Sequence, residues 1–220
     1  KGGKNMIIEE IMKTDVLTLS PKNTVRDALR LMKEKSIRHI PIIDNDKKLV
    51  GLVTSNTIKN ALPSNLQADP TISIYEENIE NIMIKEVIVG HPLDFVEEIA
   101  LTFYDMQISC IPIVSGGQLV GIVTSSDLLY TYIELTGANK PSSKIDIRVK
   151  DRSGILSDIL HIFKNHKANV LSVLVFPDSK KRDYKIITIR VQILNPLMII
   201  EDLKKAGFDV LWPNLPGITQ

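Results

Sequence analysis

Asp127 is the residue whose chemistry and setting best suit it to recognise a ligand. It ends the run Gly-Ile-Val-Thr-Ser-Ser-Asp at 121–127, in which Thr124 and Ser126 add hydroxyl groups beside the start of a predicted helix. A helix N-terminus favours anions, and one carboxylate can accept charged hydrogen bonds from two adjacent hydroxyls, each worth about 1.5–3 kcal/mol. The same Ser-Ser-Asp run is a good helix start, so capping alone is the alternative role for Asp127.

The remaining polar residues do not favour catalysis or metal binding. The four histidines, His39, His91, His161 and His166, lack metal-ligand spacing with one another. Cys110 stands at the start of a predicted core strand, which favours buried packing over a nucleophilic role. The chain shows neither the Gly-rich loop of NTPases, nor the G-x-G-x-x-G fingerprint, nor a Ser, His and acid set. We therefore expect no catalytic residue, no metal and no cofactor.

The elements that position Asp127 occur twice in the chain. Ile11-Met12 returns as Ile82-Met83, and Ile37-x-x-x-Pro41 returns as Ile108-x-x-x-Pro112, both at the same spacing. Leu-Val-Gly-Leu-Val-Thr-Ser at 49–55 recurs as Leu-Val-Gly-Ile-Val-Thr-Ser at 119–125, at a spacing shorter by one, as expected if the surface turn before it is shorter in the second copy. Duplication of this kind builds one body from two similar halves, and we expect a ligand to bind between them.

Each copy is predicted to contain a short strand, a helix, two paired strands and a second helix. In the first copy the strands are residues 16–18, 40–43 and 49–53, and residues 54–56 cap the second helix. The buried faces of the first helices are predicted to be Val25, Ala28, Leu29 and Met32 in one copy and Val96, Ile99, Ala100 and Phe103 in the other. Residues 63–76, with two prolines, form the connector.

A third unit with a different pattern follows the turn-rich residues 135–143. It is predicted to have strands at 145–149, 170–176, 184–193 and 208–212 and helices at 155–163 and 196–205. The order βαββαβ predicts an α+β sandwich, with an antiparallel sheet that carries both helices on one face.

The composition is that of an ordinary globular protein. Its 220 residues, 44% hydrophobic and 24% charged, suffice for one or two cores, and the net charge of +1 gives no broad field for nucleic acid. A single cysteine fits the reducing cytoplasm, and no apolar stretch approaches the roughly 20 residues that span a bilayer. We expect a cytoplasmic protein with no nucleic-acid or membrane partner. Residues 1–5 precede Met6, which resembles a natural start, and we expect them to be an expression remnant.

Two domain families have motifs like these. Ile40-Pro41-Ile42-Ile43-Asp44, the Gly51 to Thr54 run and their second copies resemble a tandem pair of CBS domains, and Asp151 to Leu156 followed by Asn169-Val170 resembles an ACT domain. We place the CBS domains at 6–66 and 78–137 and the ACT domain at 144–213. The predicted fold class is an α/β CBS pair followed by an α+β, ferredoxin-like ACT domain. This domain order is similar to that of acetoin-utilization proteins.

The resemblance implies a nucleotide site between the two repeats, because CBS pairs typically bind adenine nucleotides there. Asp127 matches the aspartate that binds ribose in the family, and Arg38 and His39 are expected to contact phosphate. The alternative to phosphate binding is that these two basic residues are ordinary surface residues at the start of a strand. The site implied by the resemblance consists of Leu17, Ile37, Arg38, His39, Ile122, Thr124, Ser126 and Asp127.

The opposite half of the pair departs from this pattern. Thr57 occupies the position that matches Asp127, and Ser109-Cys110 occupy the positions that match Arg38-His39. A threonine cannot act as a charged acceptor for both ribose hydroxyls. We therefore predict one competent adenine nucleotide site in each chain.

The third unit offers a second candidate site, around Asp151, Gly154 and Asn169. ACT domains often hold an amino acid at this loop, and a glycine lets the backbone turn tightly and approach a ligand closely. The alternative is that Gly154 serves only the turn and that Asn169 is a turn residue.

The resemblance implies a regulatory sensor of AMP, ADP or ATP in acetoin or acetate catabolism, with an enzyme partner that the sequence does not identify. A cleft between two halves can supply the two states of different affinity that regulation needs. We expect a homodimer through the CBS domains, the ACT domain or both. The alternatives are a ligand-indifferent scaffold for a metabolic enzyme, an amino-acid sensor that acts through the ACT domain, and a small enzyme.

Overall fold

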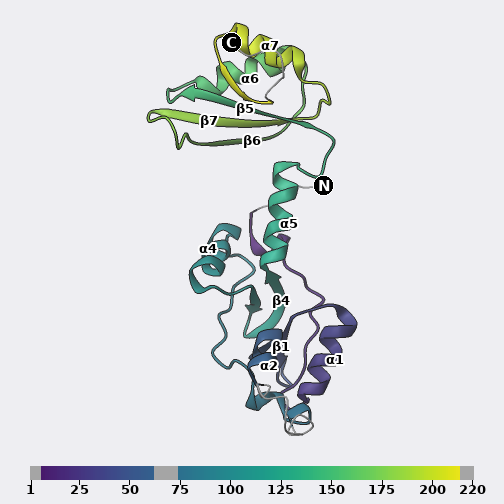
Figure 1. Cartoon of the computed structure of the whole chain (residues 1–220). Helices are drawn as coiled ribbons and strands as arrows, with labels where there is room; N and C mark the ends of the chain where they lie inside the picture. The colour runs from purple at the N-terminus through teal and green to yellow at the C-terminus, as the bar shows by residue number, and fades with distance from the viewer. Residues whose placement is uncertain (1–5, 62–73, 214–220) are drawn as a thin grey trace. The chain divides into compact units, whose positions relative to one another are not determined.

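The computed structural model describes residues 6–61 and 74–213 of the chain. The predicted remnant at 1–5, most of the predicted connector at 63–76 and the predicted end of the first CBS domain at residue 66 lie outside the described residues. The chain forms two compact units, residues 1–129 and 130–220, and the boundary falls inside helix α5, Ser125–Thr136 (Figure 1).

The first repeat is built on helix α1, Val25–Lys35, which begins with a reciprocal cap. The Thr24 hydroxyl accepts a hydrogen bond from the backbone N–H of Asp27 (3.2 Å), and the Asp27 carboxylate accepts one from the N–H of Thr24 (3.1 Å). This arrangement satisfies two N–H groups that a helix start leaves without partners. Strands β1, His39–Ile43, and β2, Leu49–Thr54, then pair antiparallel, and helix α2, Ser55–Ala61, follows directly.

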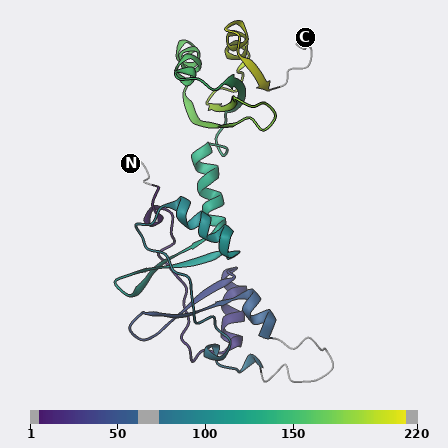
Figure 2. The ribbon, with the colours of Figure 1, turned by 90° about the vertical axis from the view of Figure 1, so that its left-hand side faces the viewer.

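The second repeat has the same order. It consists of helix α4, Val96–Met106, the antiparallel pair β3, Cys110–Ser115, and β4, Gln118–Thr124, and then α5. The two strand pairs touch, because the N–H of Leu119 donates to the carbonyl of Lys47 (3.1 Å), and Leu52, Cys110 and Ile122 share a small buried cluster. Figure 2 shows the two pairs stacked, one from each repeat. The duplication predicted from the sequence is therefore present as two matching halves of one unit.

The two repeats exchange their N-terminal segments. The 3-10 helix η1, Ile8–Glu10, precedes the first repeat in the chain, yet Ile8 is fully buried in the core of the second. The 3-10 helix η2, Ile79–Asn81, precedes the second repeat, and Ile79 is fully buried in the core of the first. Backbone hydrogen bonds hold each crossing, from the N–H of Ile8 to the carbonyl of Asp94 (3.0 Å) and from the N–H of Ile79 to that of Asn23 (2.9 Å). Each core is thus completed by a segment from the other half.

Two local predictions are wrong. Residues 16–18 form no strand; Leu19 makes a single parallel bridge to β1, where the next hydrogen bond toward Leu17 would need an N–H at Pro41, and proline has none. Ala100 is exposed rather than inward, because Val96, Ile99 and Phe103 alone form the buried stripe of α4.

The second unit has the predicted βαββαβ order. Its elements are β5, Ser143–Lys150; α6, Ile155–Asn165; β6, Val170–Pro177; β7, Tyr184–Val191; α7, Leu197–Lys205; and β8, Asp209–Trp212. The strands form one antiparallel sheet in the order β6-β7-β5-β8. Alternate isoleucines of β5 and β7 pack against both helices, which cover one face of the sheet (Figure 1). The predicted sandwich and its layers are confirmed.

Candidate functional site

A cavity of about 310 Å³ lies between the repeats at the predicted position. Its walls come from the segment before α1, the α1–β1 turn, the end of β4 and the start of α5. Seven of the eight residues predicted for the nucleotide site line it: Leu17, Ile37, Arg38, His39, Ile122, Thr124 and Ser126. The remaining lining residues, none of them predicted for this site, are Lys13, Asp15, Val16, Ser36, Ser109 and Ser125. The predicted residues from distant parts of the chain are therefore brought together.

Asp127, the eighth residue, stands directly behind this wall. Its Oδ2 atom accepts hydrogen bonds from the backbone N–H of Thr124 (2.9 Å) and from the Thr124 hydroxyl (2.5 Å). Its Oδ1 atom lies 2.7 Å from the ammonium nitrogen of Lys13. Burial alone would raise the pKa of Asp127, but the hydrogen bonds from Lys13 and Thr124 outweigh it and hold the pKa below its usual value. The carboxylate is therefore ionised at neutral pH.

Asp127 does cap helix α5, as the alternative interpretation required, and the opposite half shows what capping alone needs. There the Thr57 hydroxyl lies 2.9 Å from that of Thr54 and accepts from the N–H of Thr54 (3.3 Å). A neutral threonine therefore satisfies the same helix start. The cap does not require the negative charge of Asp127, and this charge therefore points to a role other than capping.

His39 faces the site without a charge. Its Nε2 atom lies 3.0 Å from the Ser109 hydroxyl of the other repeat. Burial, reinforced by the nearby charge of Arg38, lowers the pKa of His39 from its ordinary value of 6.5. At neutral pH the imidazole is uncharged, so the cationic contacts available to a phosphate here are Arg38 and Lys13.

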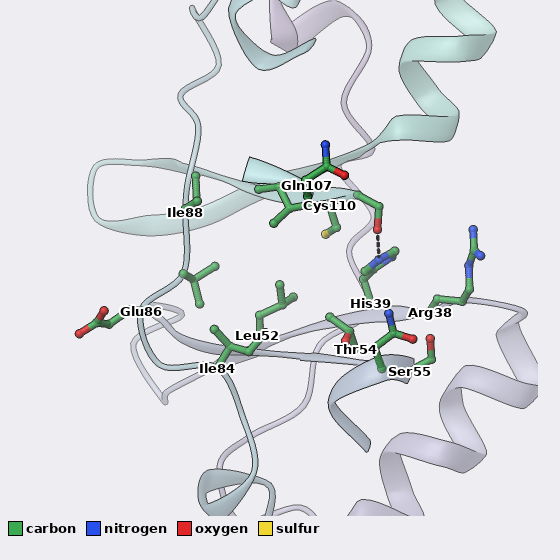
Figure 3. A pocket seen from close by; sticks show the side chains of 14 residues that line it. Arg38, His39, Leu52, Thr54, Ser55, Ile84, Glu86, Ile88, Gln107 and Cys110 are labelled. Atoms are coloured by element: carbon green, nitrogen blue, oxygen red, sulfur yellow. Dashed lines mark hydrogen bonds between the residues drawn. The ribbon is translucent and has the colours of Figure 1, made fainter. Parts of the chain in front are cut away.

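A second cavity of about 310 Å³ occupies the matching place in the opposite half (Figure 3). Figure 3 shows Cys110 and Gln107 on one wall and Leu52 and Ile84 on the other, with the His39 hydrogen bond at one end. Arg38, His39 and Ser109 line both cavities. Burial, with a smaller effect of the Asp127 charge, raises the pKa of Cys110 to about 12, so its thiol stays protonated.

The two cavities differ in charge at matched positions. Lys13 and Asp127 stand where the opposite half has Ile84 and Thr57, whereas Arg38, whose match is Ser109, lines both cavities. The backbones at these places agree, because Lys13 forms a bridge with Ile122 just as Ile84 does with Leu52. The sequence does carry a signal for the missed Lys13, since it directly follows the repeated Ile-Met pair and is charged where the second copy has an isoleucine.

The three residues predicted for an ACT ligand are placed separately. Gly154 precedes α6 in a left-handed conformation (φ 80°), Asp151 pairs with Lys185 (2.9 Å), and the Asn169 amide donates to the side chain of Gln192 (2.9 Å). A shallow cavity beside α6 is lined by other residues, Leu156, Ser157, Leu160, His161 and Lys164. The amino-acid site stays a prediction.

The described part of the chain shows neither a metal cluster nor a membrane-spanning helix. Among residues 6–61 and 74–213, no three His, Cys, Asp or Glu side chains gather in a group that could hold a metal ion. Within the same ranges, no helix combines the length and apolar character needed to cross a membrane.

Comparison with known protein families identifies the domains of the chain. The CBS domain matches residues 8–64 and 79–134, and the ACT domain matches residues 143–208. The chain therefore belongs to the CBS-domain proteins, with a CBS pair followed by an ACT domain. CBS and ACT domains are regulatory modules.

Solved structures share the fold of the CBS pair. A protein from Vibrio cholerae described as a candidate acetoin utilization protein (AcuB) is 31% identical, with a TM-score of 0.53, and the match covers 62% of this chain and 97% of that one. The CBS pair of protein MJ0100, in complex with 5'-methylthioadenosine and S-adenosyl-L-methionine, is 28% identical, with a TM-score of 0.50 over 61% of this chain and 98% of that one.

Curated relatives match over a smaller share of their length. The homoserine O-acetyltransferase of Methanohalobium evestigatum is 33% identical over 122 residues, which are 55% of this chain and 23% of that protein. The corresponding enzyme of Methanococcus vannielii is 34% identical over 132 residues, 24% of its length. The chain thus spans about a quarter of these relatives.

Proposed function

We propose that this protein is a regulatory sensor that binds one adenine nucleotide, AMP, ADP or ATP, in the cavity beside Asp127. One observation carries the proposal: of two cavities with matching backbones and equal volume, only this one is lined by Lys13 and backed by the Asp127 carboxylate, where the opposite half has Ile84 and Thr57. A carboxylate and nearby cations are the groups that recognise a ribose and a phosphate on one ligand.

The residues divide naturally among the parts of a nucleotide. The Asp127 carboxylate can accept hydrogen bonds from the ribose hydroxyls, and the apolar side chains of Val16, Leu17 and Ile37 offer a surface for the adenine ring. Arg38 supplies a cation for phosphate. The adenosine compounds bound by the similar CBS pair of MJ0100 support this class of ligand.

Binding in this cavity would bias the arrangement of the repeats. The cavity takes its walls from both halves, so a bound nucleotide bridges them and stabilises the arrangement that fits it best. We propose that this shift is read by an enzyme partner and that the protein is not itself an enzyme. The likeness to the Vibrio cholerae protein supports a process near acetoin or acetate catabolism, and the free thiol of Cys110 fits a cytoplasmic location.

We further propose that the protein forms a homodimer, and the exposed face of α4 supports a CBS contact. Leu101, Tyr104 and Met106 are 61%, 74% and 59% exposed there, whereas the matching α1 residues are Arg30, Lys33 and Lys35. The acidic residues of α4 are Glu97, Glu98 and Asp105, and it has no basic residue, whereas α1 carries four basic and two acidic ones. This complementarity favours a head-to-tail pair in which α4 packs on α1 of a second copy, with the lysine stems covering the apolar side chains. The ACT domain is the second proposed contact.

Titration calorimetry of the whole chain with AMP, ADP, ATP and a set of amino acids tests the proposed ligand. We expect a nucleotide to bind with one site per chain. Two nucleotides per chain would contradict the difference between the cavities. Failure of every compound to bind would favour the scaffold, and binding of an amino acid alone would move the sensing role to the ACT domain.

A further inference from the structure

Lys13 is fixed by its backbone and not by its side chain. Its N–H donates to the carbonyl of Ile122 and its carbonyl accepts from the N–H of Ile122, both at 3.0 Å. The side chain is 63% exposed, although its ammonium pairs with the largely buried Asp127. The anchored backbone and exposed stem leave the ammonium able to reach other acceptors in the cavity that it lines.

Both oxygens of the Asp127 carboxylate already have partners in this arrangement. Thr124 donates twice to Oδ2, and Lys13 occupies Oδ1. The Thr124 bonds belong to the cap of α5, so a ribose hydroxyl that binds Oδ1 meets the Lys13 ammonium already beside that atom. A ligand that binds Asp127 therefore either displaces the Lys13 ammonium or shares Oδ1 with it.

We propose that Lys13 exchanges its ammonium from Asp127 to the phosphate of the incoming nucleotide, so that the site selects nucleotides over nucleosides. The inference rests on the proposed nucleotide site and adds a residue that determines its specificity. A nucleotide brings its own acceptor for the displaced cation, whereas a nucleoside leaves the ammonium without a new partner or shares Oδ1 with it. Phosphate recognition and ribose recognition are coupled through one lysine.

The opposite half shows that this lysine is not needed for the fold. Ile84 holds the matching place, with the same pair of backbone hydrogen bonds to Leu52 (2.9 Å each). An apolar side chain is thus compatible with this backbone, and a substitution of Lys13 is expected to leave the unit folded. Lys13→Met is suitable because it keeps most of the length of the stem and removes the charge.

Titration calorimetry of the full chain with AMP and with adenosine tests the exchange, using wild type, Lys13→Met and Lys13→Arg. We expect wild type to prefer AMP by about tenfold or more, given the strength of charged hydrogen bonds to phosphate. Lys13→Met should weaken AMP binding by about tenfold and leave adenosine binding unchanged or tighter, because Oδ1 is released. Lys13→Arg should restore most of the preference for AMP.

The ratio of the two affinities decides the outcome. If Lys13→Met left the ratio of AMP affinity to adenosine affinity unchanged, for example by weakening both equally, Lys13 would only support Asp127. This result would overturn the exchange, while the proposed nucleotide site would stand. If wild type bound none of AMP, ADP, ATP and adenosine, the proposed function would fail, and the exchange with it.

Discussion

Replacing Asp127 by threonine isolates its charge from its role as a helix cap. The opposite repeat already has threonine at this place, and there Thr57 satisfies the helix start through Thr54. Asp127→Thr should therefore keep α5 capped. The substitution removes a charged acceptor and the ion pair with Lys13. Because the Lys13 side chain is 63% exposed, its ammonium returns to solvent, and we expect the loss of the pair to cost about 1 kcal/mol of stability.

The expected loss of affinity follows from the two kinds of hydrogen bond. A bond to a charged group is worth about 1.5–3 kcal/mol and a neutral one about 0.5–1.5 kcal/mol, so the change should cost about 1–2 kcal/mol of binding free energy. At about 1.4 kcal/mol for each factor of ten, nucleotide binding should weaken by about five- to thirtyfold. For AMP the release of Lys13 toward the phosphate offsets part of this loss, so adenosine should show it more fully.

Thermal unfolding provides a rapid assay, followed by titration calorimetry. A nucleotide at 100 times its dissociation constant adds about 2.7 kcal/mol of stability, which should raise the unfolding midpoint of wild type by several degrees. At the same concentration Asp127→Thr should lose about a third to two thirds of this rise, as expected for a five- to thirtyfold weaker affinity. Thr57→Ala, which removes the cap in the opposite half, is the matched control and should keep it. Wild-type affinity in Asp127→Thr would refute the assignment of ribose recognition to this carboxylate.

Three further predictions concern other parts of the molecule. Tyr104→Glu should raise the dimer dissociation constant in sedimentation equilibrium, because it adds a charge to the apolar face of α4. AMP affinity should stay flat as pH rises from 7 to 8.5, because the lowered pKa of His39 leaves the imidazole uncharged throughout; calorimetry at several pH values checks this. Gly154→Ala should lower the free energy of unfolding by about 1 kcal/mol in urea titration, because its left-handed backbone (φ 80°) disfavours a side chain.

The contrary results are equally specific. Glu97→Gln removes one α4 charge without touching the apolar patch and should leave most of the dimer, whereas a Tyr104→Glu protein with an unchanged dimer dissociation constant would exclude α4 from the contact. An AMP affinity that falls steadily above pH 7 would show that His39 binds phosphate as a cation. For Gly154→Ala, no atom outside the adjoining residues lies within 4 Å of the added Cβ, so an unchanged stability would mean that the left-handed backbone is not strained by alanine.

The fold and most of the lining of the cavity beside Asp127 could be predicted because both follow from local patterns and from the repeat. The repeat places Ile37 and Ile108 in equivalent turns, and the capping pattern at Thr124 and Asp127 lies within a single helical turn of sequence. Turn and cap chemistry act over short distances, so they are readable from a sequence.

What could not be predicted depends on contacts between distant segments. Lys13 reaches Asp127 only because its segment crosses to β4 of the other repeat, a pairing that no local pattern announces. The neutral state of His39 depends on burial against that repeat, which spacing alone does not reveal. The missing strand before Leu19 had a local cause in Pro41, but only the pairing geometry shows which hydrogen bond the proline removes.

The exchange of η1 and η2 makes the two repeats mutually dependent in unfolding. Neither core is closed by its own stretch of chain, since Ile8 completes the second repeat and Ile79 the first. Withdrawal of the segment around Ile8 would expose the core of the second repeat to a protease, although this segment precedes the first repeat in the chain. The pair should therefore melt as one cooperative block, in which a ligand that holds one half also protects the other from digestion.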